Sequence, residues 1–125
     1  MSVPADLKYT AEHEWIRVDG EEIVIGVTDF AQGELGDVVF IEIETEGETL
    51  SKGETFGTIE AVKTVSDLYM PVDGEVIEVN SVLEDTPELV NSEPFEGGWM
   101  IRVKMSNPSH LDELMAADEY SALIG

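Results

Sequence analysis

The sequence predicts a mainly β protein: an antiparallel β-sandwich or partly open barrel with short helices packed at one end. Two observations lead to this fold class. About seven short runs of β-prone residues follow one another, with turn signals between them. The chain has 125 residues, of which 42% are hydrophobic, which is enough for one buried core and argues against disorder. We therefore expect residues 1–125 to form a single domain.

The first two strands are expected at residues 14–18 and 23–27, where apolar and polar side chains alternate. Asp19-Gly20 lies between them, and this dipeptide favours the positive φ angles that a type I′ hairpin turn needs. A short helix is predicted over 28–35, because this segment opens with a threonine cap and ends before Gly36. A helix this short is marginal by itself, so packing must hold it.

Three later segments, 38–43, 75–79 and 99–105, also alternate apolar and polar residues and are predicted to be strands. The first would place Glu42 on one face and three apolar side chains on the other, namely Val39, Ile41 and Ile43. Each of these strands is expected to be half-buried, because only one of its faces is apolar.

A hairpin is predicted over residues 55–70, after a polar loop at 44–52. Its two β-prone runs are separated by a short turn that contains Lys63. A lysine on a tight turn is held clear of the sheet, and its ammonium group is a common target of covalent modification. A plain solvated lysine explains the same position, because most lysines are exposed. The spacing alone favours this second explanation.

The remaining segments predict short helices. Residues 85–91 contain Thr86 followed by proline, which predicts one helical turn with Thr86 as its cap. The C-terminal segment 107–124 is predicted to be helical. Its early and late apolar residues are out of phase, so two short helices with a break near Ala117-Asp118 are expected.

The charge of the chain limits its partners. Its 28 acidic and six basic residues give a net charge of −22. This field repels nucleic acid and anionic membranes, so we expect neither as a partner. Adaptation to concentrated salt is our hypothesis for the acidity, and an ordinary acidic surface is the alternative. No apolar run reaches the ~20 residues of a membrane span, and the first residues do not resemble a signal peptide, so a cytoplasmic protein is expected.

Few residues point to catalysis. The chain has no cysteine and only two histidines, His13 and His110, one near each end. Neither stands in a nucleophile motif or at a metal-ligand spacing, and no glycine-rich phosphate-binding loop is present. We therefore expect no catalytic residue, no metal site and no enzyme activity in the isolated chain. Any thiol chemistry would have to come from a cofactor.

Several segments of the chain match a known family. They are Lys8-Tyr9, His13-Glu14-Trp15, Ile25 to Thr28, Leu35 to Phe40, Ile59 to Lys63, Ser66-Asp67, Pro71 to Val76, Pro87 to Asn91 and Gly98 to Ile101. The lysine segment, Ile59 to Lys63, by itself is similar to lipoyl- and biotinyl-type domains in general. With the segments on either side of it, the chain resembles the H protein of the glycine cleavage system along nearly its whole length.

The resemblance implies a lipoyl-domain fold of the barrel-sandwich hybrid type and a non-catalytic carrier. Lys63 would carry lipoic acid in amide linkage. The carrier would take an aminomethyl group from glycine at the pyridoxal-phosphate glycine decarboxylase (P protein) to the tetrahydrofolate-dependent aminomethyltransferase (T protein), and dihydrolipoamide dehydrogenase (L protein) would reoxidise it. Lipoylating enzymes are further implied partners. The alternative is an H-like relay in lipoate distribution, or a lipoyl carrier of another complex.

Four further residues receive roles from the resemblance. Glu60 and Gly74 match the usual surroundings of a lipoylated lysine and would guide the lipoylating enzyme. Glu14 and Asp67 would line a cleft that shields the loaded arm. The chain departs from common family residues at five other positions around the lysine and the cleft: Glu12, Phe30, Glu34, Ala61 and Thr64.

Overall fold

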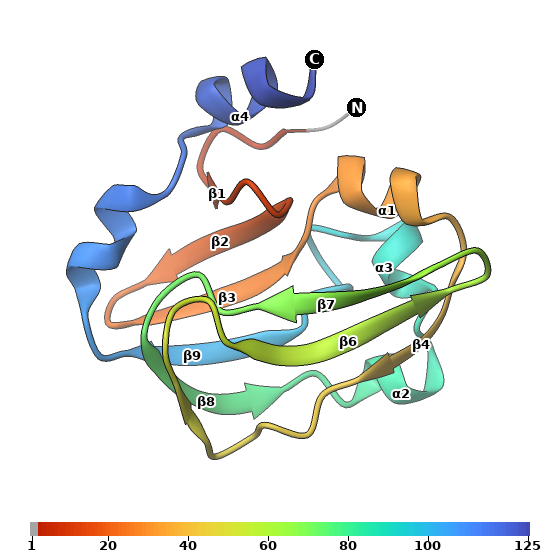
Figure 1. Ribbon diagram of the computed structural model, residues 1–125, viewed down its shortest axis with the longest axis horizontal. Coiled ribbons are helices and arrows are strands. Elements are labelled where there is room, and N and C mark those ends of the chain that lie inside the picture. Colours follow the sequence, from red (N-terminus) through yellow and green to blue (C-terminus); the bar gives the residue numbers. More distant parts are fainter. Residues whose placement is uncertain (1–2) are drawn as a thin grey trace.

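The computed structural model describes residues 3–125 and consists of two antiparallel sheets with short helices at their ends (Figure 1). One sheet has six strands in the order β1-β2-β3-β9-β8-β5, and the other has three in the order β4-β6-β7. The strands are β1 (Lys8–Tyr9), β2 (Glu14–Asp19), β3 (Glu22–Val27), β4 (Val38–Glu42), β5 (Thr49–Leu50), β6 (Thr55–Ala61), β7 (Val65–Tyr69), β8 (Gly74–Val79) and β9 (Ile101–Met105). The predicted fold class, mainly β and not closed, is confirmed.

Five short helices accompany the sheets in residues 3–125. They are α1 (Asp29–Leu35), α2 (Val82–Asp85), α3 (Leu89–Ser92), the 3₁₀-helix η1 (Pro108–Glu113) and α4 (Ala117–Ile124). None of these helices is long and apolar enough to cross a membrane. The segment that runs from residue 3 to β1 lies next to α4, at one side of the molecule (Figure 1).

The predicted first hairpin is confirmed as β2 and β3, but its turn is shifted by one residue. Asp19 pairs with Glu22, so Gly20 and Glu21 are the two central residues. Gly20 has φ 67°, whereas Glu21 does not have a positive φ. This is the pattern of a type II′ turn, which needs glycine at its first central position, and the expected type I′ turn is wrong.

Helix α1 forms as predicted. The Thr28 hydroxyl accepts a hydrogen bond from the Ala31 N–H at 3.2 Å, which satisfies one of the free donors of the first turn. The helix ends at Gly36, whose φ of 79° suits glycine and whose N–H donates to the Gln32 carbonyl. Ala31 and Leu35 are buried, so this short helix is held by the packing that its length requires.

The predicted alternation of β4 is wrong at its first half. Val39 was expected on the same buried face as Ile41, but Val39 is 52% exposed and Phe40 is 44% exposed. The pairing with β6 shifts between Val38 and Phe40, so one extra residue is inserted there as a β-bulge. A bulge reverses the alternation of side chains on one side of itself, which is why a strict period of two fails here.

Three smaller differences concern short elements. The segment 44–52, expected to be a loop, contains β5, which adds an edge strand to β8. Residues 85–91 do not form one turn capped by Thr86, because Thr86 ends α2 and α3 begins only at Leu89. The C-terminal segment does form two short helices, but the break lies at residues 114–116, just before the expected position.

The core has two parts, one on each face of β2 and β3. The larger part lies between the two sheets and includes Ile16, Ile25 and Ile59, all fully buried. The smaller part lies under α4 and is built mainly from large side chains, including Trp15 and Tyr120. Because both faces of β2 and β3 are covered by close-packed side chains, these two strands form the centre of the fold.

Candidate functional site

Lys63 lies at the exposed turn between β6 and β7, as the sequence predicted (Figure 1). The turn is fixed at two points. The Ala61 N–H donates to the Thr64 carbonyl at 2.8 Å, and the Val62 N–H donates to the carbonyl of Asp37, before β4, at 3.0 Å. The first bond closes the turn and the second ties it to the rest of the chain, so the backbone under Lys63 is held in place.

The Lys63 side chain lies across Gly36. A β-carbon added at Gly36 would approach Cε of Lys63 to 3.3 Å and Nζ to 3.9 Å. Gly36 also has φ 79°, which other residues rarely adopt. Glycine therefore serves two purposes here: it ends α1 and leaves room for the lysine stem.

The segment beneath the lysine is held by Asn91 of α3. Its side-chain oxygen accepts a hydrogen bond from the Val38 N–H at 2.8 Å. Its amide nitrogen donates to the Gly36 carbonyl at 2.9 Å and to the side-chain oxygen of Gln32 at 3.0 Å. One side chain thus joins α1, α3 and the start of β4. The sequence did not indicate this role for Asn91. It showed only that the segment with Leu89, Val90 and Asn91 resembles the family.

Glu60 and Asp67 lie on the hairpin below the lysine. Strand register places Glu60 beside Val65 of β7 and Phe40 of β4, and it places Asp67 beside Thr58 of β6. Both carboxylates are exposed. Glu60 is therefore in the part of the surface that an enzyme acting on Lys63 would meet.

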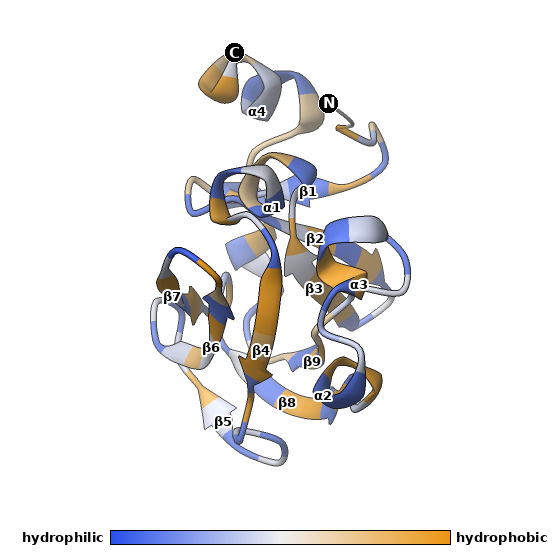
Figure 2. Cartoon of the chain, turned by 90° about the vertical axis from the view of Figure 1, so that its right-hand side faces the viewer, coloured by the Kyte–Doolittle hydropathy of each residue, from blue (hydrophilic) through white to orange (hydrophobic). Residues whose placement is uncertain are grey.

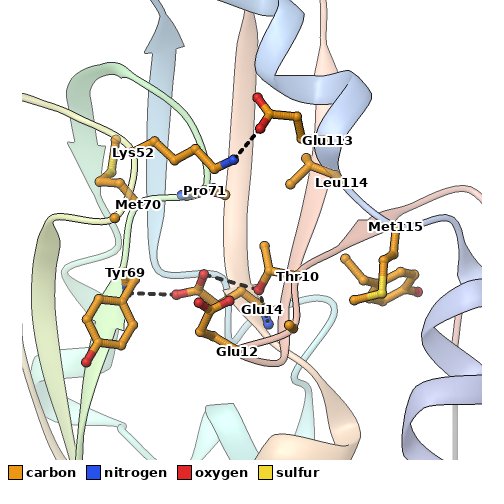
Figure 3. Close-up of a pocket in the computed structure, with 13 residues that line it drawn as sticks. Thr10, Glu12, Glu14, Lys52, Tyr69, Met70, Pro71, Glu113, Leu114 and Met115 are labelled. Carbon is orange, nitrogen blue, oxygen red and sulfur yellow. Dashed lines mark hydrogen bonds and ion pairs between the residues drawn. The ribbon is translucent and has the colours of Figure 1, made fainter.

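Glu14 is a buried carboxyl group, with only 3% of the residue exposed. Its Oε2 accepts the Tyr69 N–H at 2.9 Å, and its Oε1 accepts the Thr10 hydroxyl at 3.4 Å (Figure 3). Burial raises the pKa of Glu14 to about 8, and the nearby Glu12 carboxylate adds to this, while the two hydrogen bonds oppose it. Glu14 is therefore mainly protonated at neutral pH.

Glu14 and Asp67 both line a cleft of about 140 Å³ between α1 and the lysine hairpin. The rest of the lining is largely apolar and includes Val27, Ala31, Leu35, Ile59 and Leu68. The structure thus brings together the two residues that the resemblance assigned to a cleft, although they are far apart in the sequence. Of the residues that depart from the common family pattern, Glu12 also lines this cleft.

A second, larger cavity of about 340 Å³ is also lined by Glu14 (Figure 3). Its walls come from the loop before β2, the end of β7 and the segment after η1, where Leu114 and Met115 face it. Glu12 and Glu14 belong to the lining of both spaces. The buried carboxyl group therefore stands at the boundary between them.

The loop that leads to Glu14 is held by the C-terminal helix. The Tyr120 hydroxyl of α4 lies 2.7 Å from the Thr28 hydroxyl and within hydrogen-bond distance of His13. His13 has φ 67°, and it is the one non-glycine residue with positive φ among residues 3–125. This contact was missed from the sequence, which carries no signal for it, because the two residues are 107 apart and the positive φ of His13 is seen only in the structure.

Gly74 lies in the six-stranded sheet and not on the hairpin. A β-carbon at Gly74 would approach Cγ1 of Val103 to 2.5 Å and the Lys104 carbonyl to 2.6 Å. Close packing against β9 therefore gives a structural reason for glycine at this position. Its role in lipoylation stays a prediction.

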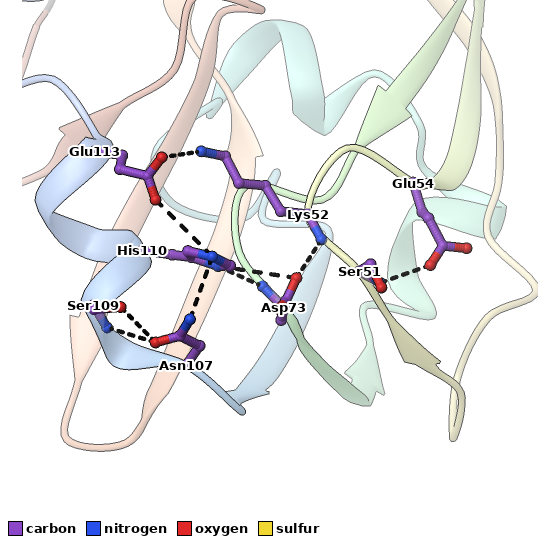
Figure 4. A network of polar contacts seen from close by, with 8 residues as sticks. All are labelled: Ser51, Lys52, Glu54, Asp73, Asn107, Ser109, His110 and Glu113. Atoms are coloured by element: carbon purple, nitrogen blue, oxygen red, sulfur yellow. Dashed lines mark hydrogen bonds and ion pairs between the residues drawn. The ribbon is translucent and has the colours of Figure 1, made fainter.

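A polar network holds η1 against the loop after β5 (Figure 4). Lys52 Nζ pairs with Glu113 Oε1 at 2.9 Å, and the hydrogen bond lowers the pKa of Glu113. His110 Nδ1 accepts the Asp73 N–H at 3.2 Å. In residues 3–125 no group of three or more histidine, cysteine, aspartate or glutamate side chains is arranged to hold a metal ion.

Together, the open antiparallel sheets and the lysine on a fixed hairpin turn beside a cleft have the form of the lipoyl- and biotinyl-type domains as a class. Comparison with known proteins places the chain more narrowly. It belongs to the glycine cleavage H-protein family, whose model matches residues 7–125. Membership supports the role of a lipoyl carrier in the glycine cleavage system and a non-catalytic part in it.

Individual relatives cover the chain almost completely. A glycine cleavage system H protein of Bacteroides fragilis is 55% identical over 124 residues, which are 99% of this chain and 98% of the relative. One of Staphylococcus saprophyticus is 53% identical over 125 residues, which are 100% of this chain and 99% of the relative. The crystal structure of a glycine cleavage system H protein from Mycobacterium marinum superposes on this chain with a TM-score of 0.88 at 38% sequence identity. The superposition covers 96% of this chain and 97% of the chain from Mycobacterium marinum.

Proposed function

We propose that Lys63 carries lipoic acid in amide linkage and that the protein transports the aminomethyl group of glycine. The transport runs from glycine decarboxylase to the aminomethyltransferase, and dihydrolipoamide dehydrogenase restores the carrier. The observation that supports this most directly is the position of Lys63, exposed on a turn whose backbone is tied at two points. Family membership supports the system in which the carrier works.

The residues around Lys63 fit a lipoyl group. The stem of the lysine has room over Gly36, at the end of α1. Ala31 and Leu35, which line the cleft, lie on the same helix. Apolar side chains of this kind suit the alkyl chain and the ring of lipoate. When bound, the lipoyl group supplies a disulfide that can be opened and closed, and the chain has no cysteine of its own to do this.

We propose that Glu14 and Asp67 shield the loaded end of the arm. Glu14 holds a proton at its buried carboxyl group and has hydrogen bonds that fix its orientation. Asp67 is exposed on β7, where its carboxylate attracts a cationic amine. The apolar lining between them excludes water from the space where a labile adduct would be held. Departures such as Glu12 affect the rim of this cleft and not the attachment point.

The attachment is tested by the intact mass of protein purified from its native source under lipoate-replete conditions. A lipoyl-sized increment is expected on the wild type, and Lys63→Arg should abolish it. Lys104→Arg is the matched control, because Lys104 is an exposed lysine on β9. A wild-type protein without the increment would refute the proposal.

The system is tested separately by glycine–bicarbonate exchange with glycine decarboxylase. The lipoylated wild type should support exchange, and Lys63→Arg should not. A protein that is lipoylated but inactive in exchange would instead be a relay in lipoate distribution or a carrier of another complex. The cytoplasmic location and the adaptation to salt, both expected from the sequence, stay predictions.

A further inference from the structure

The outer face of the six-stranded sheet combines residues that are rare in this acidic chain. This face points away from the three-stranded sheet: in an end view, β2 and β3 lie on one side of the molecule and β6 and β7 on the other (Figure 2). Both arginines of the chain, Arg17 and Arg102, lie on this face beside Trp99. Arginine and tryptophan are enriched at the centres of protein interfaces. The face is therefore a candidate interface.

Arg17 is a cation without an ion pair. Its Cζ lies 5.0 Å from the centre of the Trp15 ring, and one of its N–H groups donates to the Phe95 carbonyl at 2.8 Å. The chain has 28 acidic residues, yet within residues 3–125 no carboxylate is paired with Arg17. A guanidinium has five N–H donors and binds a carboxylate best through two of them. Arg17 is therefore held in place with donors available for an acidic group.

Strand register places four side chains in one row across this face, which we call the outer row. Arg17 of β2 lies beside Val24 of β3, which lies beside Arg102 of β9. On its other side Arg102 lies beside Glu78 of β8. A hollow of about 340 Å³ is lined by the four residues of the outer row and by Trp99. The outer row is thus positive at one end and negative at the other.

The charge of Arg102, in the middle of the outer row, is already compensated. Its Nη1 lies 3.1 Å from Oδ2 of Asp19 and 3.0 Å from Oε1 of Glu22. Glu78 is farther away, with Oε1 at 3.9 Å from Nε of Arg102, and the Glu78 side chain is 57% exposed. The two ends of the outer row, Arg17 and Glu78, are therefore the charged groups that can pair with another molecule.

We propose that this face binds a second copy of the chain across a two-fold axis. Two antiparallel sheets pack face to face with their strands within about 30° of each other. A two-fold axis that runs along the strands, between β3 and β9, reverses the order of the outer row. Arg17 then falls over Glu78 of the second copy, and Glu78 falls over Arg17 of the second copy. Both chains use the same surface, as in the two-fold dimers that are commonest among oligomers.

The neighbouring row favours the same register on balance. It consists of Asp19, Glu22, Lys104 and Glu75, on β2, β3, β9 and β8. The same axis places Lys104 over Glu22 of the second copy, which is attractive, and Asp19 over Glu75, which is repulsive. The Asp19 side chain is 68% exposed and stays partly in water. Charged pairs of this kind fix the register, and burial of the hollow beside Trp99 removes apolar surface from water.

Salt decides whether this dimer forms. Each chain has a net charge of −22, so two copies repel each other over a screening length of about 10 Å at 0.1 M salt. At 1 M salt the screening length is about 3 Å, which removes most of the overall repulsion and leaves pairs in direct contact. We expect monomers at low salt and dimers at high salt.

The dimer leaves both Lys63 side chains accessible. Lys63 lies on the turn between β6 and β7, and these strands are on the side of the molecule opposite to the interface (Figure 2). A dimer therefore presents its two lysine turns on its two outer sides. The proposed dimer is independent of the lipoyl group, since its interface contains no residue of the lysine turn or of the cleft.

The test is sedimentation equilibrium of the full-length wild-type protein in KCl at about 0.1 M and about 1 M. A mass of 13.7 kDa is expected at low salt and twice that mass at high salt. The dissociation constant (Kd) should fall about tenfold or more between the two conditions. A wild type that is monomeric in both would overturn the proposal, and so would a dimer that dissociates when salt is added.

Two charge reversals test the register. Arg17→Glu and Glu78→Arg should each raise Kd at high salt about tenfold or more, because each makes both Arg17–Glu78 contacts of the dimer repulsive. An equimolar mixture of the two variants should dimerise like the wild type, because opposite charges then face each other at both contacts. Thermal unfolding checks that each variant is folded. Glu78 is exposed, so Glu78→Arg tests the contact even if Arg17→Glu is unstable.

Lys63→Glu is the matched control. It changes the net charge as much as Arg17→Glu does, but on the opposite sheet, and it should change Kd less than about twofold. An equal loss of dimer in both variants would show that net charge alone acts, and would overturn the proposal. A dimer that persists in both charge reversals, or a mixture that stays monomeric, would also overturn it. The mass of lipoylated Lys63 is measured separately, so a failed dimer leaves the proposed function standing.

Discussion

Tyr120 and His13 are separated by 107 residues in the sequence, yet the Tyr120 hydroxyl lies 2.9 Å from Nδ1 of His13. The Tyr120 ring also stacks on Tyr9, with centroids 4.7 Å apart and planes 7° from parallel. The last helix is thereby attached to the loop that precedes Glu14. The C-terminal segment is part of the site's support, although none of its residues lines the cleft below the hairpin.

Removing this hydroxyl should destabilise the protein. In Tyr120→Phe the Thr28 and His13 side chains lose a shared, buried partner, which costs about 1–2 kcal/mol. Urea unfolding monitored by tryptophan fluorescence measures the change. Tyr69→Phe is the control, because Tyr69 is 36% exposed and its loss should stay within about 0.5 kcal/mol. Equal stability of Tyr120→Phe and wild type would show that the hydrogen bonds contribute nothing net.

The carboxyl group of Glu14 should make stability depend on pH. Its pKa is about 8 in the folded protein and close to the ordinary glutamate value of 4.5 when the chain is unfolded. The folded state therefore holds a proton that the unfolded state releases between these values. The contribution of this group to the free energy of unfolding is therefore fully present below pH 4.5 and is lost as the pH rises toward 8. Glu14→Gln keeps an acceptor for the Tyr69 N–H and removes the titration.

The measurement is urea unfolding at a series of pH values from 5 to about 8.5. The difference in unfolding free energy between wild type and Glu14→Gln should shift in favour of the variant as the pH rises through this window. All other carboxyl groups are present in both proteins and cancel in the difference. A difference that stays constant with pH would show that Glu14 is ionised in the folded state.

Asn91→Ala should loosen the segment beneath the lysine. The substitution removes three hydrogen bonds and leaves the Val38 N–H without its side-chain acceptor. We expect a loss of about 2–4 kcal/mol in unfolding free energy. Hydrogen exchange should also become faster at the Val38 and Val62 amides. If hydrogen exchange at these two amides is unchanged, Asn91 stabilises the protein but does not hold the lysine turn in place.

Gly74→Ala should destabilise the sheet without touching the hairpin. The added methyl group has no room between the Val103 side chain and the Lys104 carbonyl, and overpacking of this kind costs about 1–3 kcal/mol. Thermal unfolding measures the loss, and Gly33→Ala, at an exposed position with open space around it, is the control. Lipoylation of Gly74→Ala below its melting temperature then tests a direct role of Gly74 in recognition. A normal rate would leave only the packing role.

Salt should stabilise this chain if its acidity is an adaptation to concentrated salt. The net charge of −22 makes like-charge repulsion large, and raising the salt from 0.1 M to 1 M shortens the screening length from about 10 Å to about 3 Å. The thermal midpoint should rise by about 5 °C or more, which corresponds to roughly 1 kcal/mol for a domain of this size. Ion pairs such as Arg102 with Asp19 are weakened at the same time. A midpoint that molar salt leaves unmoved would favour an ordinary acidic surface.

Local sequence signals were enough to predict the elements that depend on local physics. The hairpin that carries Lys63, helix α1 between Thr28 and Gly36 and the open antiparallel architecture follow from alternation, caps and turn residues. The bulge at Val39 was not predictable, because an alternating strand gives no sign of an inserted residue. Its consequence is large, since it turns Val39 and Phe40 outward.

Contacts between segments that are distant in the sequence could not be predicted either. The sequence pointed to Glu14 and Asp67 only through the resemblance, and no spacing rule connects them. The support by Tyr120 and by Asn91 depends on tertiary pairing across more than fifty residues. Polar residues of this kind look like ordinary surface residues until the partner that satisfies them is known.

The two hydrogen bonds that hold the turn at Ala61 and Val62 have a kinetic meaning. They fix the backbone at the turn, so a group attached at Nζ can move only by rotation about the bonds of the side chain and of the group itself. The positions that the group can reach therefore surround one fixed point, and the rest of the protein occupies those that face inward. A partner that binds at the turn meets the group in a limited outward volume, and the bonds that must be ordered for reaction are those of the side chain and the group, not those of the backbone.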